Sequence, residues 1–217
     1  MTLTDIEARV LGSLIEKDIT TPDYYPLSLN ALVHACNQKN NRDPVMNLDE
    51  SAVRDALTSL QEKRLAGPAA GADSRVAKFE HRLQEVFNFD RREIAVVCVL
   101  LLRGLQTPGE IRSRTDRMFH FEALDDVVST LDRLAQREPP LVLMLPRQPG
   151  TKESRYAHLF SGEPQIAVDT GSSDLASTKA PANSADRISA LEEEVARLRA
   201  ELSEVQQQLA AFRKQFE

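Results

Sequence analysis

Histidine, cysteine and short catalytic motifs determine whether this chain could perform bond-making chemistry, and all of them are sparse. His34 and Cys36 are two positions apart in an expected helix, so they point to different faces and make a poor metal pair. His81, His120 and His158 are scattered along the sequence. The sequence has no glycine-rich phosphate loop, HExxH or CxxC motif. We therefore expect a protein that is not an enzyme and that needs no cofactor or metal.

The two cysteines are better explained as packed core residues than as reactive or metal-binding residues. Both lie in expected helices, so we expect no disulfide framework and a reducing, cytoplasmic location. For Cys36 a structural role is favoured over redox or metal use, whereas Cys98 lies inside the apolar run Ile94–Leu102 and should be core. That run is about half the length of a bilayer-spanning helix, and the N-terminus does not resemble a signal peptide, so we expect no membrane partner.

Nucleic-acid contact is the remaining chemistry, and the first candidates lie on one expected helix. In the helix from about Asp49 to Leu65, arginine and glutamine side chains that can read base edges point outward. The outward candidates are Arg54, Thr58 and Gln61. The preceding loop and the following strand add cations that could contact phosphates: Lys39, Arg42, Arg75 and Lys78. The same helix also carries four acidic residues, so an ordinary solvated face remains the alternative.

The second half of the chain distributes its charge differently. Its expected third helix exposes Asp125, Asp126 and Asp132, which would repel phosphates. The positive charge lies on the expected second helix and in the second hairpin, at Arg112, Arg114, Arg117, Arg147, Lys152 and Arg155. This half therefore either contacts DNA through those elements or binds a protein instead.

The net charge of the whole chain limits how it could bind nucleic acid. The 217 residues have a formal net charge of -6 and a sequence pI of about 5.4. Strong, sequence-independent binding requires a basic face, so it is not expected, although a local basic patch is compatible with an acidic protein.

Three helices and a small hairpin are predicted in the first 86 residues. The first helix should begin at Thr4, where Thr4 and Glu7 form a capping box, and the second should run from Ser28 to about Cys36. A polar loop, 37–47, precedes the third helix, which residues 66–68 should stop. Residues 75–80 alternate like a strand. This order predicts a winged-helix domain over residues 1–86.

The same pattern returns in residues 87–160. Aligning Glu7 with Glu93 places Val10 on Val96 and Leu14 on Leu100. Asp90 begins a second capping box, and Thr107 and Pro108 start the next helix. Two strands, 141–145 and 154–159, should form a hairpin. The duplicated spacing predicts two compact winged-helix units in tandem.

The C-terminal part reads as a linker and a dimerising helix. Residues 161–186 are rich in Ser, Thr, Ala, Gly, Pro and Asp and should form a flexible linker. Residues 187–217 show a heptad pattern typical of a parallel coiled coil, and the alternative is an amphipathic helix that packs on the chain's own domains. The candidate dimerisation residues are Ile188, Leu191, Val195, Leu198, Leu202, Val205, Leu209 and Phe212.

Three segments strongly resemble the YceH family of uncharacterised bacterial proteins. They are SLNALVHACNQKNNRDPVMNL, LLLRGLQTPGEIRSR and GTKESRYAHLFSGE, and the likeness covers about residues 3–163. The resemblance implies a tandem winged-helix fold and no catalytic residues. The positions that carry it are Asn37, Gln38, Lys39, Asn41, Arg42, Pro44, Pro108, Gly109, Glu110, Arg112, Ser113, Arg114, Glu153, Ser154, Arg155 and Tyr156.

The sequence as a whole predicts a mainly α protein with small β-wings (α+β): tandem winged-helix domains, a flexible linker and a C-terminal coiled-coil helix. We expect a homodimer that binds DNA in the manner of a transcriptional regulator. The alternative is a protein–protein interaction scaffold that uses the same domains without contacting DNA.

Overall fold

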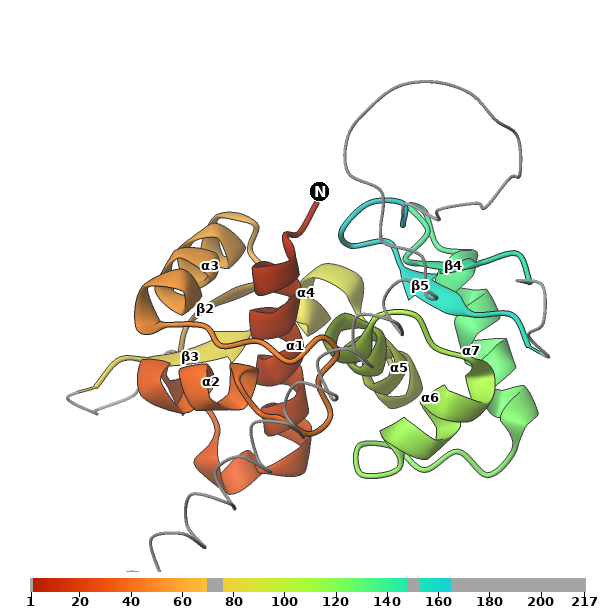
Figure 1. Cartoon of the computed structure of the whole chain (residues 1–217), viewed down its shortest axis with the longest axis horizontal. Helices are drawn as coiled ribbons and strands as arrows, with labels where there is room; N and C mark the ends of the chain where they lie inside the picture. Colours follow the sequence, from red (N-terminus) through yellow and green to blue (C-terminus); the bar gives the residue numbers. More distant parts are fainter. Residues whose placement is uncertain (1, 70–75, 148–152, 165–217) are drawn as a thin grey trace, which may run out of the picture. The chain divides into compact units, whose positions relative to one another are not determined.

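The computed structural model of the 217-residue chain describes residues 2–69, 76–147 and 153–164. Residues 1–166 form one compact unit, which is mainly helical and has small antiparallel sheets (Figure 1). The heptad segment 187–217, its dimerisation residues and most of the predicted linker 161–186 lie outside the described residues. Among the helices that are described, none has both the length and the apolar character needed to cross a bilayer.

The first half contains the three helices that the sequence predicts. They are α1 (Asp5–Thr20), α2 (Leu29–Cys36) and α3 (Glu50–Glu62). Thr4 caps α1 as expected, because its hydroxyl accepts the Glu7 N–H and the Glu7 carboxylate accepts the Thr4 N–H. Ser28 and Asp49 cap the other two helices.

A three-stranded sheet accompanies these helices and is larger than the predicted hairpin. Its order is β1 (Leu27–Ser28), β3 (Lys78–His81) and β2 (Ala66–Pro68), with both neighbouring pairs antiparallel. Residues 66–68, which were expected only to stop the third helix, form a strand, and the strand predicted at 75–80 begins later. The short helices η1 (Pro22–Tyr24) and α4 (Leu83–Phe87) were not predicted, because segments of three and five residues carry little periodicity.

The second half has the same order of helices. They are α5 (Arg91–Arg103), α6 (Pro108–Thr115) and α7 (Leu124–Ala135), followed by the antiparallel strands β4 (Val142–Met144) and β5 (Tyr156–His158). Asp90 forms the predicted capping box with Glu93, and Thr107, which was predicted only to start its helix, forms another with Glu110. Both strands are shorter than predicted, and an isolated bridge between Gln106 and Tyr156 extends the sheet at β5.

One ion pair occurs at equivalent positions in both halves. The capping glutamate of α1, Glu7, pairs with Lys63 at 2.6 Å, immediately after α3. Its equivalent in α5, Glu93, pairs with Arg137 at 2.8 Å, shortly after α7. In each half a mostly buried carboxylate therefore joins the start of the first helix to the end of the third. This shared contact supports the repeat inferred from the apolar spacing.

The two repeats do not have separate cores. Helices α1 and α5 lie side by side (Figure 1), and the buried apolar residues of both halves belong to one hydrophobic cluster. Backbone hydrogen bonds also join the halves, from the Leu3 N–H to the Phe160 carbonyl (2.7 Å) and from the Asp43 N–H to the Leu102 carbonyl (2.9 Å). The predicted domain limits at residues 86 and 160 stay predictions, whereas the expectation of two independent compact units is replaced by one joined core.

Candidate nucleic-acid interface

The outward face of α3 presents three of the candidate residues. Val53, Leu57 and Leu60 are buried, so the positions between them face solvent. Arg54, Thr58 and Gln61 are all exposed and follow one another at steps of four and three along the helix, which places them on one side. Helix packing therefore presents this arginine, threonine and glutamine together.

Contacts within α3 order the side chains of this face and leave them exposed to solvent. The Arg54 guanidinium pairs with Glu50 one turn earlier, and both side chains are 62% exposed. The Thr58 hydroxyl donates to the Arg54 carbonyl at 3.0 Å. An exposed pair of this kind contributes only about 0.3–0.5 kcal/mol, so a stronger anionic ligand can replace Glu50.

The other cations of the first half occupy different environments. Lys39 is exposed in the loop between α2 and α3, and Lys78 is half-buried in β3. Arg75 lies outside the described residues. Of the predicted phosphate contacts in this half, Lys39 and Lys78 therefore remain accessible in the part of the chain that is described.

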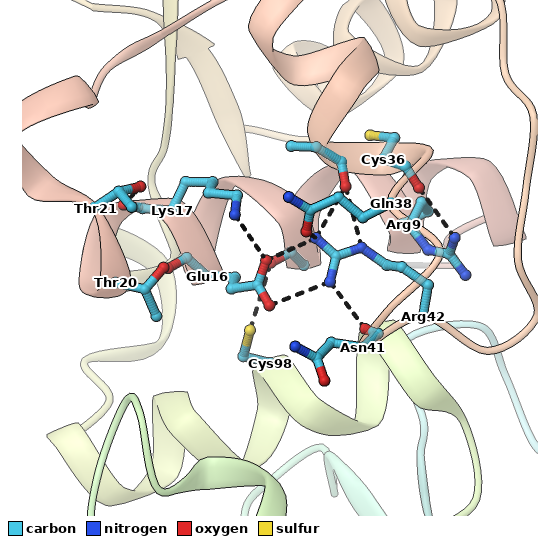
Figure 2. A network of polar contacts seen from close by, with 12 residues as sticks. Arg9, Glu16, Lys17, Thr20, Thr21, Cys36, Gln38, Asn41, Arg42 and Cys98 are labelled. Atoms are coloured by element: carbon cyan, nitrogen blue, oxygen red, sulfur yellow. Dashed lines mark hydrogen bonds and ion pairs between the residues drawn. The ribbon is translucent and has the colours of Figure 1, made fainter.

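Arg42 is buried, and this corrects the prediction that it contacts a phosphate. Its side chain has 0% exposure and pairs with Glu16 of α1 at 2.7 Å (Figure 2). The same guanidinium donates to the carbonyls of Ala35 and Asn41 and to the Gln38 amide oxygen. With its N–H groups directed at protein oxygens and no access to solvent, Arg42 fixes the polar loop to α1.

The pKa of Glu16 reflects this pairing. Burial alone would raise the pKa of the Glu16 carboxyl, but the hydrogen bond and charge of Arg42 outweigh burial and lower it. Lys17 adds a second cation at 3.5 Å. Glu16 is therefore held as a carboxylate, and the buried charge of Arg42 is compensated.

A second buried arginine, Arg9, lies beside this network. It donates to the Cys36 carbonyl at 3.2 Å and to the Pro44 carbonyl at 2.6 Å. Burial, and then the charge of Arg42, lower the pKa of Arg9. Cys36 and Cys98 are both buried and unpaired, and burial raises the pKa of each thiol. A protonated, enclosed thiol is a weak nucleophile, in line with the structural role favoured for Cys36.

The loop between α2 and α3 is ordered by its own asparagines. Asn37 donates to the Leu48 carbonyl and accepts from the Leu48 N–H, both at 2.7 Å, which closes the loop. Asn41 adopts a left-handed backbone conformation, with φ of 61°, and accepts from Arg103 of α5. The motif that carried the family resemblance therefore contains residues that build the loop and join it to the second half.

On α6 the three arginines differ in how firmly they are held. Arg112 donates to the carbonyls of Phe121 and Glu122, at 3.2 and 2.5 Å, and so fixes the turn before α7. Arg114 pairs with Glu110 at 3.4 Å. Arg117, just after α6, is exposed and makes no hydrogen bond or ion pair with the described residues. Arg117 is thus the most available of the three.

The remaining candidates belong to the segment between β4 and β5. Arg147 and Arg155 are exposed near the second sheet, and Arg155 donates to the Leu105 carbonyl at 3.4 Å. Lys152 lies outside the described residues. On α7, Asp125 and Asp132 are exposed as the sequence predicts.

Sequence reasoning missed the residues that organise the interior. Glu16, Arg9 and Arg103 were not singled out, because a charged residue on an amphipathic helix normally faces solvent. In the described ranges, no three His, Cys, Asp or Glu side chains converge in a way that could hold a metal ion.

Comparison with known proteins places this sequence in a family. The model for "Protein of unknown function, DUF480" matches residues 3–151. A UPF0502 protein of Koribacter versatilis is 58% identical over 169 residues, covering 76% of this chain and 78% of the relative. UPF0502 proteins of Geobacter sulfurreducens and Aeromonas hydrophila are 52% and 48% identical, and each comparison covers at least 97% of both chains. The chain therefore belongs to the DUF480 (UPF0502) family of bacterial proteins, the YceH-like family that its loop and second-half motifs indicate.

Proposed function

We propose that the protein is a non-enzymatic, tandem winged-helix protein that binds DNA as a homodimer, in the manner of a transcriptional regulator. In each half, three helices followed by antiparallel strands occur in the order that a winged helix requires. The third helix of a winged helix is the element that enters the major groove, which assigns that role to α3 in the first half.

The observation that carries this proposal is the outward face of α3. Arg54 and Gln61 have the donor geometry that bases recognise in the major groove, and Thr58 lies between them. Lys39 and Lys78 come from the segments before and after this helix, where phosphate contacts would fix its position on the duplex. Arg42 takes no part in contacting DNA, because it is buried.

The heptad segment supplies the second element of the proposal. Its apolar positions favour a parallel pair of helices, and two copies of α3 in one dimer would read two half-sites. A dimer raises the overall affinity of an acidic protein for DNA, because two weak specific contacts act together.

Binding of the full-length protein to fluorescent genomic fragments, measured by anisotropy across a salt series, tests the proposal. Gln61→Ala should reduce affinity for preferred fragments by about 10- to 100-fold, the cost of one lost base contact. Asp55→Asn, on the same helix, should leave or increase the affinity. Absence of binding to any fragment at low salt, or equal binding by wild type and Gln61→Ala, would contradict the proposal.

A protein-binding scaffold is the second candidate, and the second half favours it. The exposed face of α7 carries Asp125 and Asp132, which oppose phosphate contact. Strand β4 exposes Leu143 and Met144, at 37% and 57%. A stable protein partner captured from the native cell, lost on Met144→Glu and unaffected by nuclease, would favour this function over DNA binding.

A further inference from the structure

A small cleft lies where α1, the loop after α2, α5 and α6 meet. Its volume is ≈ 30 Å³, and three arginines line it: Arg103 at the end of α5, Arg114 on α6 and Arg117 just after α6. Asn41 from the loop, and Glu16 and Thr20 from α1, complete its polar lining. The end of α5 and the C-terminal end of α6 therefore bring three guanidinium groups to one place, beside α1 and the loop after α2.

Cations are in excess at this cleft. Burial, and then the charges of Arg114 and Arg42, lower the pKa of Arg103, although the charges of Glu16 and Asp43 act in the opposite direction. Arg103 has one hydrogen-bond acceptor, Asn41, among the described residues. Arg117 has no partner in the described part of the chain. The guanidinium groups therefore retain N–H donors that no oxygen of the described residues accepts.

Two of the carboxylates near the cleft, Glu16 and Glu110, leave its arginines available to an anion. Glu16 is paired with Arg42 at 2.7 Å and with Lys17 at 3.5 Å, so its charge is already matched (Figure 2). Glu110 is 3.4 Å from Arg114, a loose contact between side chains that are 29% and 33% exposed. Arg114 can therefore exchange Glu110 for a more highly charged anion.

We propose that this cleft binds one phosphate group, which Arg103, Arg114 and Arg117 hold through charge-assisted hydrogen bonds. Asn41 adds a donor, because its Oδ1 accepts from Arg103 and its Nδ2 is left to donate. The cleft has space for about two water molecules, which is enough for two oxygens of a phosphate group and too little for a base or a sugar. The phosphate belongs either to a DNA backbone or to a small phosphorylated molecule.

The proposal does not depend on base reading by α3. If the phosphate is part of DNA, the cleft adds a positioning contact to the proposed function. If it is part of a small molecule, the ligand joins the first half to the second through Asn41 and the arginines. Both sources require the same three guanidinium groups.

Isothermal titration of the full-length protein with inorganic phosphate, against chloride at matched ionic strength, tests the site. Wild type should give a saturable single-site isotherm with phosphate and none with chloride. Arg117→Gln should weaken phosphate binding about tenfold or more, as expected for the loss of a charged hydrogen-bond donor. Arg114→Gln should have the same effect, and circular dichroism would establish that both variants are folded.

Arg91→Gln is the matched control. Arg91 is an exposed arginine at the opposite end of α5, about 18 Å along the helix axis from Arg103. The Arg91→Gln variant changes the net charge by the same amount as Arg117→Gln and should bind phosphate like wild type. Equal phosphate binding by Arg117→Gln and Arg91→Gln, or no saturable binding by wild type, would overturn the proposal.

Anisotropy with DNA then separates the two sources. If Arg117→Gln also weakens DNA binding more than Arg91→Gln does, the phosphate comes from the backbone. If DNA binding is equal in both variants while phosphate binding is lost, the ligand is a small phosphorylated molecule. Failure of DNA binding altogether would contradict the proposed function and leave the phosphate isotherm as the test of this site.

Discussion

The Cys98 Sγ lies 3.4 Å from the Gly12 carbonyl oxygen, in a contact between α5 and α1. When the repeats are aligned on Glu7 and Glu93, Gly12 and Cys98 occupy the same position. Equivalent positions of the two halves thus meet where the helices pack together. Gly12 permits this approach, because a Cβ there would lie 2.9 Å from Leu102 and 3.2 Å from Leu101.

Replacing Gly12 by alanine should therefore destabilise the protein. The added methyl group forces Leu102 to move within a packed core, which costs about 1–3 kcal/mol, while alanine returns up to about 1 kcal/mol of helix propensity. We expect a net loss of about 1 kcal/mol or more in chemical denaturation. Gly109→Ala is the control, because its nearest neighbour to an added Cβ is 3.9 Å away and no loss is expected. Equal stability changes for the two variants would show that Gly12 is not a close-packed position.

The sequence predicts the parts of this fold that depend on local signals, and not the contacts between distant segments. Helices α1, α2, α5 and α6 begin where capping residues placed them, because a cap is a local signal. The joined core could not be predicted from the sequence. A helix that packs within its own domain and a helix that also packs against the other repeat can have the same apolar stripe. Strand β1, with two residues, is fixed only by pairing with distant β3.

Glu16→Gln should destabilise the protein strongly. It removes the charge that compensates buried Arg42, and breaking a buried pair in this way costs about 3–5 kcal/mol. Glu50→Gln is the matched control, since it breaks an exposed Glu–Arg pair worth about 0.5 kcal/mol or less. Urea denaturation measures both. A loss for Glu16→Gln as small as that of the control would mean that Arg42 does not depend on Glu16.

Stability should also fall as the pH drops from about 6.5 towards 4. Burial lowers the pKa of His158 from 6.5 to about 4, although the charge of Asp5 acts in the opposite direction. Between these values the unfolded chain binds the extra proton and the folded chain does not. The stabilisation is complete above pH 6.5 and is lost as the pH falls, with a slope of at most about 1.4 kcal/mol per unit.

Thermal denaturation at a series of pH values would measure this slope. His158→Gln cannot titrate, so its stability should vary less than that of wild type between pH 6.5 and 4. His34→Gln, which removes an exposed histidine, is the control and should keep the wild-type slope. A wild-type slope retained in His158→Gln would contradict the assignment.

Deleting residues 188–217 should lower the oligomeric state and leave the helical unit folded. The core of residues 1–166 is closed by its own helices and strands, so circular dichroism of that unit should persist. Sedimentation equilibrium of the full-length and shortened chains would measure the change. An unchanged assembly after the deletion would remove the heptad segment from the proposed dimer interface.

The candidate site was only partly predictable, because some of its residues are positioned by their own helix and others by contacts with distant segments. Arg54, Thr58 and Gln61 could be placed on an outer face because the apolar residues of their own helix define its inner face. Arg42 could not be placed, because Glu16 reaches it from another helix. The cleft at Arg103, Arg114 and Arg117 depends on how α5 and α6 meet α1 and the loop, which periodicity does not encode.

Hydrogen exchange of the full-length protein with and without genomic DNA at low salt tests the central claim most directly. The account predicts slower exchange in α3 and the loop before it, near Arg54 and Lys39, and little change in α7. Unchanged exchange in α3 while DNA is bound, or protection confined to α7, would contradict it.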